Sequence, residues 1–188
     1  MGTLQNPRIF FLTGPKHAGK TSVGRVLAAV YQGDFIDLDE LVETQTGQSP
    51  RSLYKADPGC FSRAEIGALQ TVINTGNTPK ASPLLIVATG GGIIDNDDAL
   101  SLLKSPGAVV MYLEVSAETA WERICRSSAA TGELPPFLNT AHPQETHKNL
   151  HERRGAAYKR IAHITIQAEH KTPESICREI GTWISKYR

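Results

Sequence analysis

The sequence lacks the marks of a secreted protein, of a membrane protein and of a protein that binds metal through a cysteine or histidine cluster. Its three cysteines are far apart, form no C-x-x-C pair and have no histidines at metal-ligand spacing: Cys60, Cys125 and Cys177. No apolar run approaches the length of a membrane span, and residues 1–7 carry no basic segment leading into an apolar one. We therefore expect reduced thiols and a cytoplasmic location.

An excess of charge is lacking as well. The 20 Lys and Arg residues nearly balance the 19 Asp and Glu residues, and aromatic residues make up only 6% of the chain. No basic stripe and no aromatic stacking platform is visible, so the sequence does not favour nucleic acid or anionic membrane as a partner. Any anion site is expected to be local. The length of 188 residues suits one domain with its own core.

One segment carries a specific motif, the P-loop pattern G-x-x-x-x-G-K-[ST]. It follows an apolar run at 8–12 and precedes a helix-like segment at 22–31. In this pattern the glycines let backbone N–H groups surround phosphates, the lysine reaches the β- and γ-oxygens, and the hydroxyl can ligate Mg²⁺. The alternative is a glycine-rich turn with an incidental lysine. The sequence predicts a nucleoside triphosphate site made by Gly14, Pro15, Lys16, His17, Ala18, Gly19, Lys20 and Thr21.

Short apolar runs alternate with helical patterns along the chain. The expected strands are 9–12, 35–36, 84–88, 109–113 and 164–166. The expected helices between and after them are 21–31, 38–44, 98–103, 117–125 and 173–187. This alternation predicts an α/β fold, with a parallel sheet and helices on both faces. Residues 47–75 look mostly helical, whereas 127–145, around Pro135 and Pro136, have no clear period and predict a mobile flap.

Two carboxylates stand where the second expected strand ends. In open α/β sheets ligands bind at the carboxyl ends of the strands, and strand alternation would put Asp37 and Asp39 on one side. Asp37 would then face the Mg²⁺ shell, and Asp39 could accept a proton or a hydrogen bond from a substrate hydroxyl. The alternative is that one of them, Asp39 in particular, only caps the helix that follows.

Further candidates follow the third strand and lie near the C-terminal end. Gly90, Gly91 and Gly92 leave the backbone bare, either for direct contact with a ligand or for a tight turn that needs a positive φ. Arg154, at the end of a helix expected from about residue 146, offers a planar fork for a carboxylate or phosphate. Its alternative is a solvated surface charge.

Taken together, these motifs resemble the shikimate kinase family over essentially the whole chain. The shared features occur in the family's order and spacing: the P-loop, Asp37-x-Asp39, the region of Phe61, Gly90 to Gly92, the flap and Arg154-x-x-x-Tyr158. The resemblance implies one three-layer α/β/α P-loop kinase domain over 1–188, with a five-stranded parallel sheet of order 2-3-1-4-5 and a lid at about 127–145. It also implies a monomer that uses ATP and Mg²⁺.

By position, the resemblance implies transfer of the ATP γ-phosphoryl group to a hydroxyl of shikimate. Asp39 would hold the substrate hydroxyls and act as a base, Gly90 to Gly92 would line the acceptor, and Arg154 would bind its carboxylate. The loop around Ala168 to Lys171 would lie against adenine. ATP contacts are expected from Arg126 and Lys171 as well as from the P-loop.

The sequence departs from the family at its cations. The family motif Phe-Arg-x-x-Glu reads Phe61-Ser62-Arg63-Ala64-Glu65 here, so Ser62 stands where the substrate arginine is expected. Arg63 lies one position further on, about 100° round a helix, and would bind substrate only if the register slips. Loss of a charge-assisted hydrogen bond costs about 1.5–3 kcal/mol. The acceptor is then either shikimate or a different molecule, such as a quinate-like compound or a sugar acid.

The flap also lacks the arginine that the family carries before a proline. Residues 132–138 read Gly-Glu-Leu-Pro-Pro-Phe-Leu, without a basic side chain. Arginines that stabilise the transition state of phosphoryl transfer contribute about 10³–10⁵ in rate. We hypothesise that Lys16, inside the P-loop, supplies this charge, the alternative being that it extends into solvent. A nucleotide-binding sensor with weak or no kinase activity is the remaining function to test.

Overall fold

The computed structural model of the chain describes residues 8–77 and 84–186 and centres on a parallel sheet. Its strands are β1 Ile9–Thr13, β2 Asp34–Asp37, β3 Leu85–Ala88, β4 Ala108–Glu114 and β5 Ile164–Gln167. They follow the order β2-β3-β1-β4-β5, and each neighbouring pair is parallel. The predicted fold class and strand order are confirmed.

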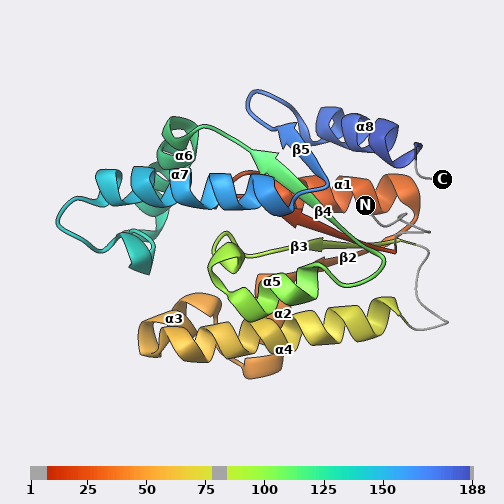
Figure 1. Ribbon diagram of the computed structural model, residues 1–188. Coiled ribbons are helices and arrows are strands. Elements are labelled where there is room, and N and C mark those ends of the chain that lie inside the picture. The colour runs from red at the N-terminus through yellow and green to blue at the C-terminus, as the bar shows by residue number, and fades with distance from the viewer. Residues whose placement is uncertain (1–7, 78–83, 187–188) are drawn as a thin grey trace.

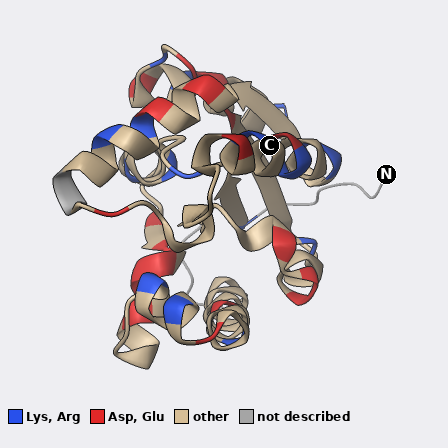
Figure 2. Ribbon diagram, turned by 90° about the vertical axis from the view of Figure 1, so that its left-hand side faces the viewer, with Lys and Arg blue, Asp and Glu red and all other residues tan. Residues whose placement is uncertain are grey.

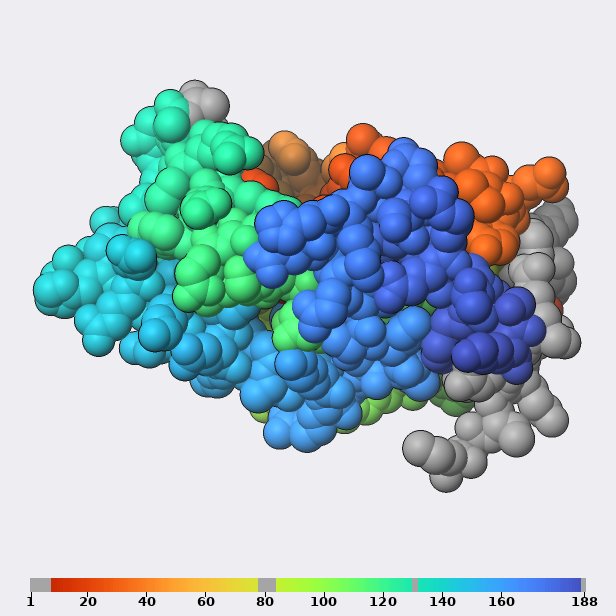
Figure 3. Space-filling model, turned by 90° about the horizontal axis from the view of Figure 1, so that it is seen from above, coloured from red at the N-terminus to blue at the C-terminus, as the bar shows by residue number. Residues whose placement is uncertain are grey.

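Helices cover both faces of this sheet (Figure 1). One face carries α1 Lys20–Tyr31 and α8 Pro173–Ile184, which pack against each other. The opposite face carries α4 Pro58–Gly76 and α5 Asp97–Leu103, with α2 Leu38–Thr46 and α3 Pro50–Ala56 packed on α4. The remaining helices, α6 Ala117–Thr131 and α7 Pro143–Ile161, pack together at one end. Seen from above, α8 and the segment before it lie beside α1 (Figure 3).

The central strand is buried on both faces because it lies between two hydrophobic clusters. Phe10 and Leu12 belong to the cluster under α1 and α8, and Ile9 and Phe11 belong to the cluster under α4 and α5. Consecutive residues of a strand point to opposite faces, so a continuous apolar run is what a doubly covered parallel strand requires. The same reason explains the fully buried β3.

The helix starts follow the capping residues in the sequence. The Ser116 and Thr172 hydroxyls accept hydrogen bonds from the backbone N–H groups of Thr119 and Ser175 and begin α6 and α8. Asp57 caps α4 through the N–H groups of Gly59 and Cys60. Since proline cannot continue a preceding helix, the Asp57-Pro58 step divides the predicted helical stretch 47–75 into α3 and α4.

The predicted flap at 127–145 is more regular than its sequence indicates. Helix α6 continues to Thr131 rather than ending at residue 125, a 3₁₀ turn occupies Pro136–Leu138, and α7 begins at Pro143 rather than near residue 146. The polar segment after residue 125 lacks apolar periodicity but contains no helix breaker before Gly132. Gly132 ends α6 with a φ of +77°, a conformation that favours glycine.

Two predictions touch residues beyond the described ranges. The last predicted helix extends to residue 187, which lies outside them, and the described part of that helix ends at Ile184. The N-terminal segment 1–7 also lies outside them. Among the residues described, no helix combines the length and the apolar character that a membrane crossing needs. Acidic and basic residues are interspersed over the ribbon (Figure 2), in keeping with the balanced composition.

Candidate active site

A cavity of about 620 Å³ opens where the parallel strands end. Its lining comes from the loops after β1 and β3, from the end of β2 and the start of α2, from α3 and α4, from the segment between α6 and α7, and from α7 itself. This is the edge at which parallel α/β sheets bind ligands. Segments far apart in the sequence therefore contribute to one site.

The loop between β1 and α1 has the geometry of a phosphate cradle. Gly14 has a φ of +141°, and a Cβ there would lie 2.5 Å from the Leu113 carbonyl oxygen, so only glycine fits. Gly19 precedes α1 with a φ of 96° and no side-chain cap, which leaves the first N–H groups of the helix available to an anion. Arg123 Nη1 donates to the His17 carbonyl oxygen at 2.9 Å and holds the loop against α6.

Lys20 is folded back onto this loop. Its Nζ donates to the carbonyl oxygens of Gly14 and Pro15 at 3.0 and 2.8 Å. Burial lowers the pKa of Lys20 to about 8, although Asp39 and Asp37 oppose this shift. Phosphate oxygens would replace carbonyl oxygens as acceptors and favour the charged ammonium. Beside it, the Nε2 atom of His17 is buried without a hydrogen-bond partner in the described part of the chain.

Asp37, at the end of β2, has two partners. Its Oδ2 accepts a hydrogen bond from Thr21 Oγ1 at 2.7 Å, and its Oδ1 accepts one from the backbone N–H of Asp39 at 3.1 Å. Asp37 is therefore the residue that caps α2, and the alternative that Asp39 is the cap is wrong. A hydroxyl beside a carboxylate is a donor set that suits Mg²⁺, which takes few protein ligands and several from phosphates and water.

Asp39 lies in the first turn of α2 and not on the strand, because β2 ends at Asp37. The prediction of strand alternation was wrong on this point, yet both side chains line the cavity. Asp39 is exposed to the open cavity, and its Oδ1 lies close to Gly90. Desolvation by the protein around the cavity, together with the charge of Asp37, raises the pKa of Asp39.

The three glycines after β3 make room for close neighbours. A Cβ on Gly90 would lie 3.1 Å from Asp39 Oδ1, and one on Gly91 would lie 2.9 Å from the backbone nitrogen of Lys16. A Cβ on Gly92 would lie 3.3 Å from Arg154 Nη2. None of the three has a positive φ. The alternative of a turn that needs positive φ is therefore wrong, and close approach is the reason for glycine.

Arg154 reaches the cavity from α7, and its side chain is only 18% exposed. The alternative of a solvated surface charge is wrong for this residue. Its Nε and Nη2 lie 2.9 and 2.7 Å from Asp95 Oδ2, and its guanidinium lies over the Phe137 ring. One turn on, Tyr158 donates to the Gly91 carbonyl oxygen at 3.3 Å.

Sequence reasoning assigned no role to Glu65, Asp95, Asn96 or Arg51. Glu65 is buried behind Gly90, where desolvation raises its pKa to about 7. Asp95 and Asn96 follow the three glycines closely, and this proximity was the one available signal. Arg51 lines the cavity from α3, and nothing in its local sequence marks it.

Four residues of interest lie elsewhere. Ser62 donates to the Pro58 carbonyl oxygen of its own helix. Arg63 contacts Asp57 and Cys60 with a side chain 70% exposed, so the helix has not slipped and does not bring Arg63 to the cavity. Arg126 is exposed on α6, and Lys171 forms an ion pair with Glu179 at 2.6 Å. Arg126 and Lys171 are also absent from the lining.

The comparisons with known proteins agree with this arrangement. A shikimate kinase from Sulfurihydrogenibium sp. is 32% identical over 177 residues, covering 94% of this chain and 97% of that protein. A shikimate kinase from Marinomonas sp. is 30% identical over 179 residues, covering 94% of this chain and 91% of that protein. A solved structure, the shikimate kinase from Acinetobacter baumannii in complex with shikimate, superposes with a TM-score of 0.83 at 26% identity and covers 98% of this chain and 97% of that one. The family model for shikimate kinase matches residues 16–185, and the chain belongs to that family.

Proposed function

We propose that this protein transfers the γ-phosphoryl group of ATP to a hydroxyl of shikimate, giving 3-phosphoshikimate and ADP in aromatic amino acid biosynthesis. The observation that carries the proposal is a shared cavity: the P-loop lies on one side, and Asp39 and the glycines after β3 face it. A phosphate donor and a hydroxylated acceptor can therefore meet between them. Family membership supports the same reaction.

The P-loop would hold the phosphates of ATP through backbone N–H groups and Lys20. Thr21 and Asp37 would hold Mg²⁺, which when bound neutralises charge on the β- and γ-oxygens. Asp39 would accept the proton of the acceptor hydroxyl as the hydroxyl oxygen bonds to the γ-phosphorus. At the same time, the bond from that phosphorus to the oxygen that bridges it to the β-phosphorus breaks, and ADP leaves. The raised pKa of Asp39 suits this role because it makes the carboxylate a stronger base.

Gly90, Gly91, Gly92 and Arg154 would bind the acceptor. The Nε and Nη2 of Arg154 already contact Asp95. Its Nη1 has no protein partner among the described residues and can bind a carboxylate. Arg126 and Lys171 remain proposed ATP contacts, which would require nucleotide at the outer edge of the site. We also propose that 127–145 acts as a lid and that the protein is a cytoplasmic monomer without a nucleic acid partner.

A different acceptor is the second candidate, and the position of Ser62 favours it. The Ser62 hydroxyl bonds within its helix and Arg63 points outward, so α4 offers no cation to an acceptor carboxylate. A quinate-like molecule or a sugar acid could bind in this cavity with its carboxylate held by Arg154 alone.

ADP release by the purified protein with Mg²⁺ and ATP tests the proposal, with shikimate compared to no acceptor and to a panel of quinate and sugar acids. Turnover that depends on shikimate supports it. Turnover with another acceptor only would make Ser62 the mark of changed specificity. Tight ATP binding without turnover on any acceptor would favour a nucleotide sensor.

A further inference from the structure

Phosphoryl transfer spreads negative charge over the oxygens of the transferred group, and kinases stabilise it with cations. Two of the basic side chains that line the cavity already have partners: Lys20 bonds to the P-loop carbonyls, and Arg154 bonds to Asp95. The facing segment 132–138 contains no Lys or Arg. A cation on that side of the cavity must therefore come from another element.

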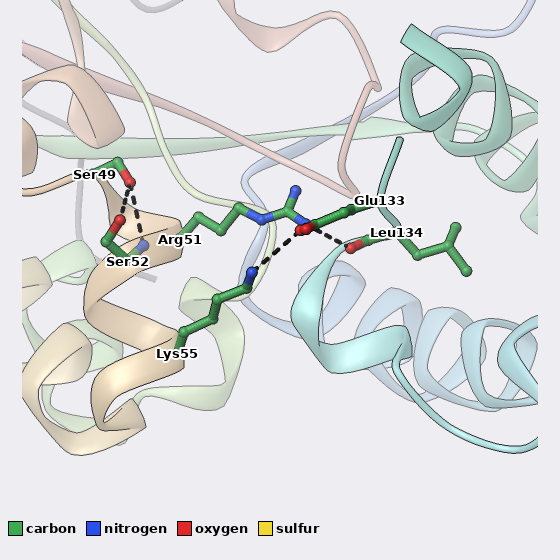
Figure 4. Close-up of polar contacts among 6 residues, drawn as sticks. All are labelled: Ser49, Arg51, Ser52, Lys55, Glu133 and Leu134. Atoms are coloured by element: carbon green, nitrogen blue, oxygen red, sulfur yellow. Dashed lines mark hydrogen bonds and ion pairs between the residues drawn. The ribbon is translucent and has the colours of Figure 1, made fainter. Parts of the chain in front are cut away.

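Helix α3 supplies one next to this segment (Figure 4). Arg51 lies in the first turn of α3, which the Ser49 hydroxyl caps by accepting from the Ser52 N–H at 3.2 Å. The Arg51 Nη2 donates to Glu133 Oε2 and, at 3.0 Å, to the Leu134 carbonyl oxygen. Arg51 thus joins the segment between α6 and α7 to α3.

Lys55, one turn further along α3, donates to the same Glu133 oxygen at 3.1 Å. Two cations therefore share one carboxylate and lower the pKa of Glu133. Lys55 can satisfy Glu133 when Arg51 has another partner. Arg51 lines the cavity and Lys55 does not.

The guanidinium of Arg51 has donors to spare. Arginine carries five N–H donors in a planar fork, and only Nη2 of Arg51 has protein acceptors among the residues described. The other terminal nitrogen is turned away from Glu133 in Figure 4. A fork anchored on one side and free on the other is preorganised for the oxygens of a phosphoryl group.

We propose that Arg51 supplies from helix α3 the arginine that the lid lacks, its free guanidinium edge contacting the oxygens of the phosphoryl group in transfer while Glu133 and Leu134 hold its other edge. Arg51 exchanges no proton and forms no bond, so the reaction remains as balanced above. The inference rests on the proposed kinase function and adds a catalytic residue to it.

Three variants test the inference: Arg51→Met, Glu133→Gln and, as the matched control on the same helix and carboxylate, Lys55→Met. With an accepted substrate, Arg51→Met should lower kcat by about 10³ or more, within the 10³–10⁵ range for transition-state arginines, and leave the KM for ATP within about threefold. Glu133→Gln should cost less than about tenfold and Lys55→Met less than about threefold, because both leave the guanidinium in place. Arg51→Lys should recover part of the loss.

Equal losses for Arg51→Met and Glu133→Gln would overturn the inference, because Arg51 would then only join α3 to the lid. An unchanged kcat in Arg51→Met would overturn it too.

A second measurement does not need the right acceptor. Calorimetry compares the binding of Mg²⁺-ADP with and without fluoroaluminate, which mimics the planar phosphoryl group. The wild type should bind the mixture more tightly, and Arg51→Met should lose most of that gain while binding Mg²⁺-ADP alone normally. If shikimate is not phosphorylated but this gain depends on Arg51, the proposed acceptor is wrong and the inference stands. No gain in the wild type, or a gain kept by Arg51→Met, would overturn it.

Discussion

Asn96 joins Glu65 to the backbone of Ser62. Its Nδ2 donates to Glu65 Oε2 at 3.0 Å and to the Ser62 carbonyl oxygen at 3.2 Å. The other oxygen of Glu65, Oε1, is buried without a hydrogen-bond partner in the described ranges. Glu65 is thus a buried acid behind Gly90, and its side-chain hydrogen bond comes from the neutral amide of Asn96.

Glu65 should make the protein less stable as pH rises. Its folded-state pKa of about 7 lies above the usual 4.5, so between these values the folded chain keeps a proton that the unfolded chain has released. Stability is then lost as pH rises through this window, by roughly 3 kcal/mol in all. In Glu65→Gln the fall in Tm between about pH 5 and pH 8 should shrink by roughly 6–12 °C.

Thermal unfolding at the two pH values measures this difference. Glu43→Gln, on the exposed face of α2, is the control and should keep the wild-type pH dependence. An equal fall in Tm for wild type and Glu65→Gln would show that Glu65 is ionised in both states.

Asp39→Asn should lower kcat by about 10²–10⁴, because the amide cannot accept the hydroxyl proton. The wild type should lose kcat/KM on the acid side, below the raised pKa of Asp39, and the variant should lack that limb. Steady-state kinetics over pH measures both effects. Asp34→Asn, at the exposed start of β2, is the matched control. A variant that keeps its rate and its acid limb would remove Asp39 from the mechanism.

Ser62→Arg should improve binding of an acceptor that carries a carboxylate. One charge-assisted hydrogen bond is worth about 1.5–3 kcal/mol, so the KM for shikimate should fall by about tenfold or more. The contact from Asn96 uses the backbone of residue 62 and is kept. Ser62→Met, of similar length without charge, should leave the KM unchanged. The same improvement in both variants would show that side-chain bulk is responsible.

Lys16→Ala should lower kcat by at least about tenfold and change the KM for ATP by less than about threefold if Lys16 adds charge at the γ-phosphate. Lys16 is exposed but lines the cavity, and its backbone lies against Gly91, which is consistent with such a contact. Lys104→Ala, at the exposed end of α5, serves as control. Unchanged turnover would leave Lys16 as a solvated side chain.

The sequence was enough to predict a feature where the residues that form it lie close together along the chain. The phosphate cradle depends on glycines at 14 and 19 and on a lysine that folds back within six residues, so the P-loop was readable as a motif. The caps Ser116 and Thr172 also act within three residues, at the starts of two helices whose ranges were predicted as 117–125 and 173–187.

The rest depends on residues brought together from distant parts of the chain. Arg51 and Glu133 are 82 positions apart, and only the packing of α3 beside the α6–α7 segment joins them. Arg63 shows the opposite case, because local acceptors on Asp57 and Cys60 hold it on the outer side of α4. The outward direction of Arg63 thus has a local cause, whereas the partner of Arg51 lies far away in the sequence.

The place of β1 in the sheet has a consequence for synthesis on the ribosome. Strand β1 pairs with β3 and with β4, but both of these strands leave the ribosome long after β1. At about 5–20 residues per second, the apolar β1 waits on the order of several seconds without a neighbouring strand. Nascent chains of this protein should therefore present Phe10 and Phe11 to chaperones until β3 has left the exit tunnel.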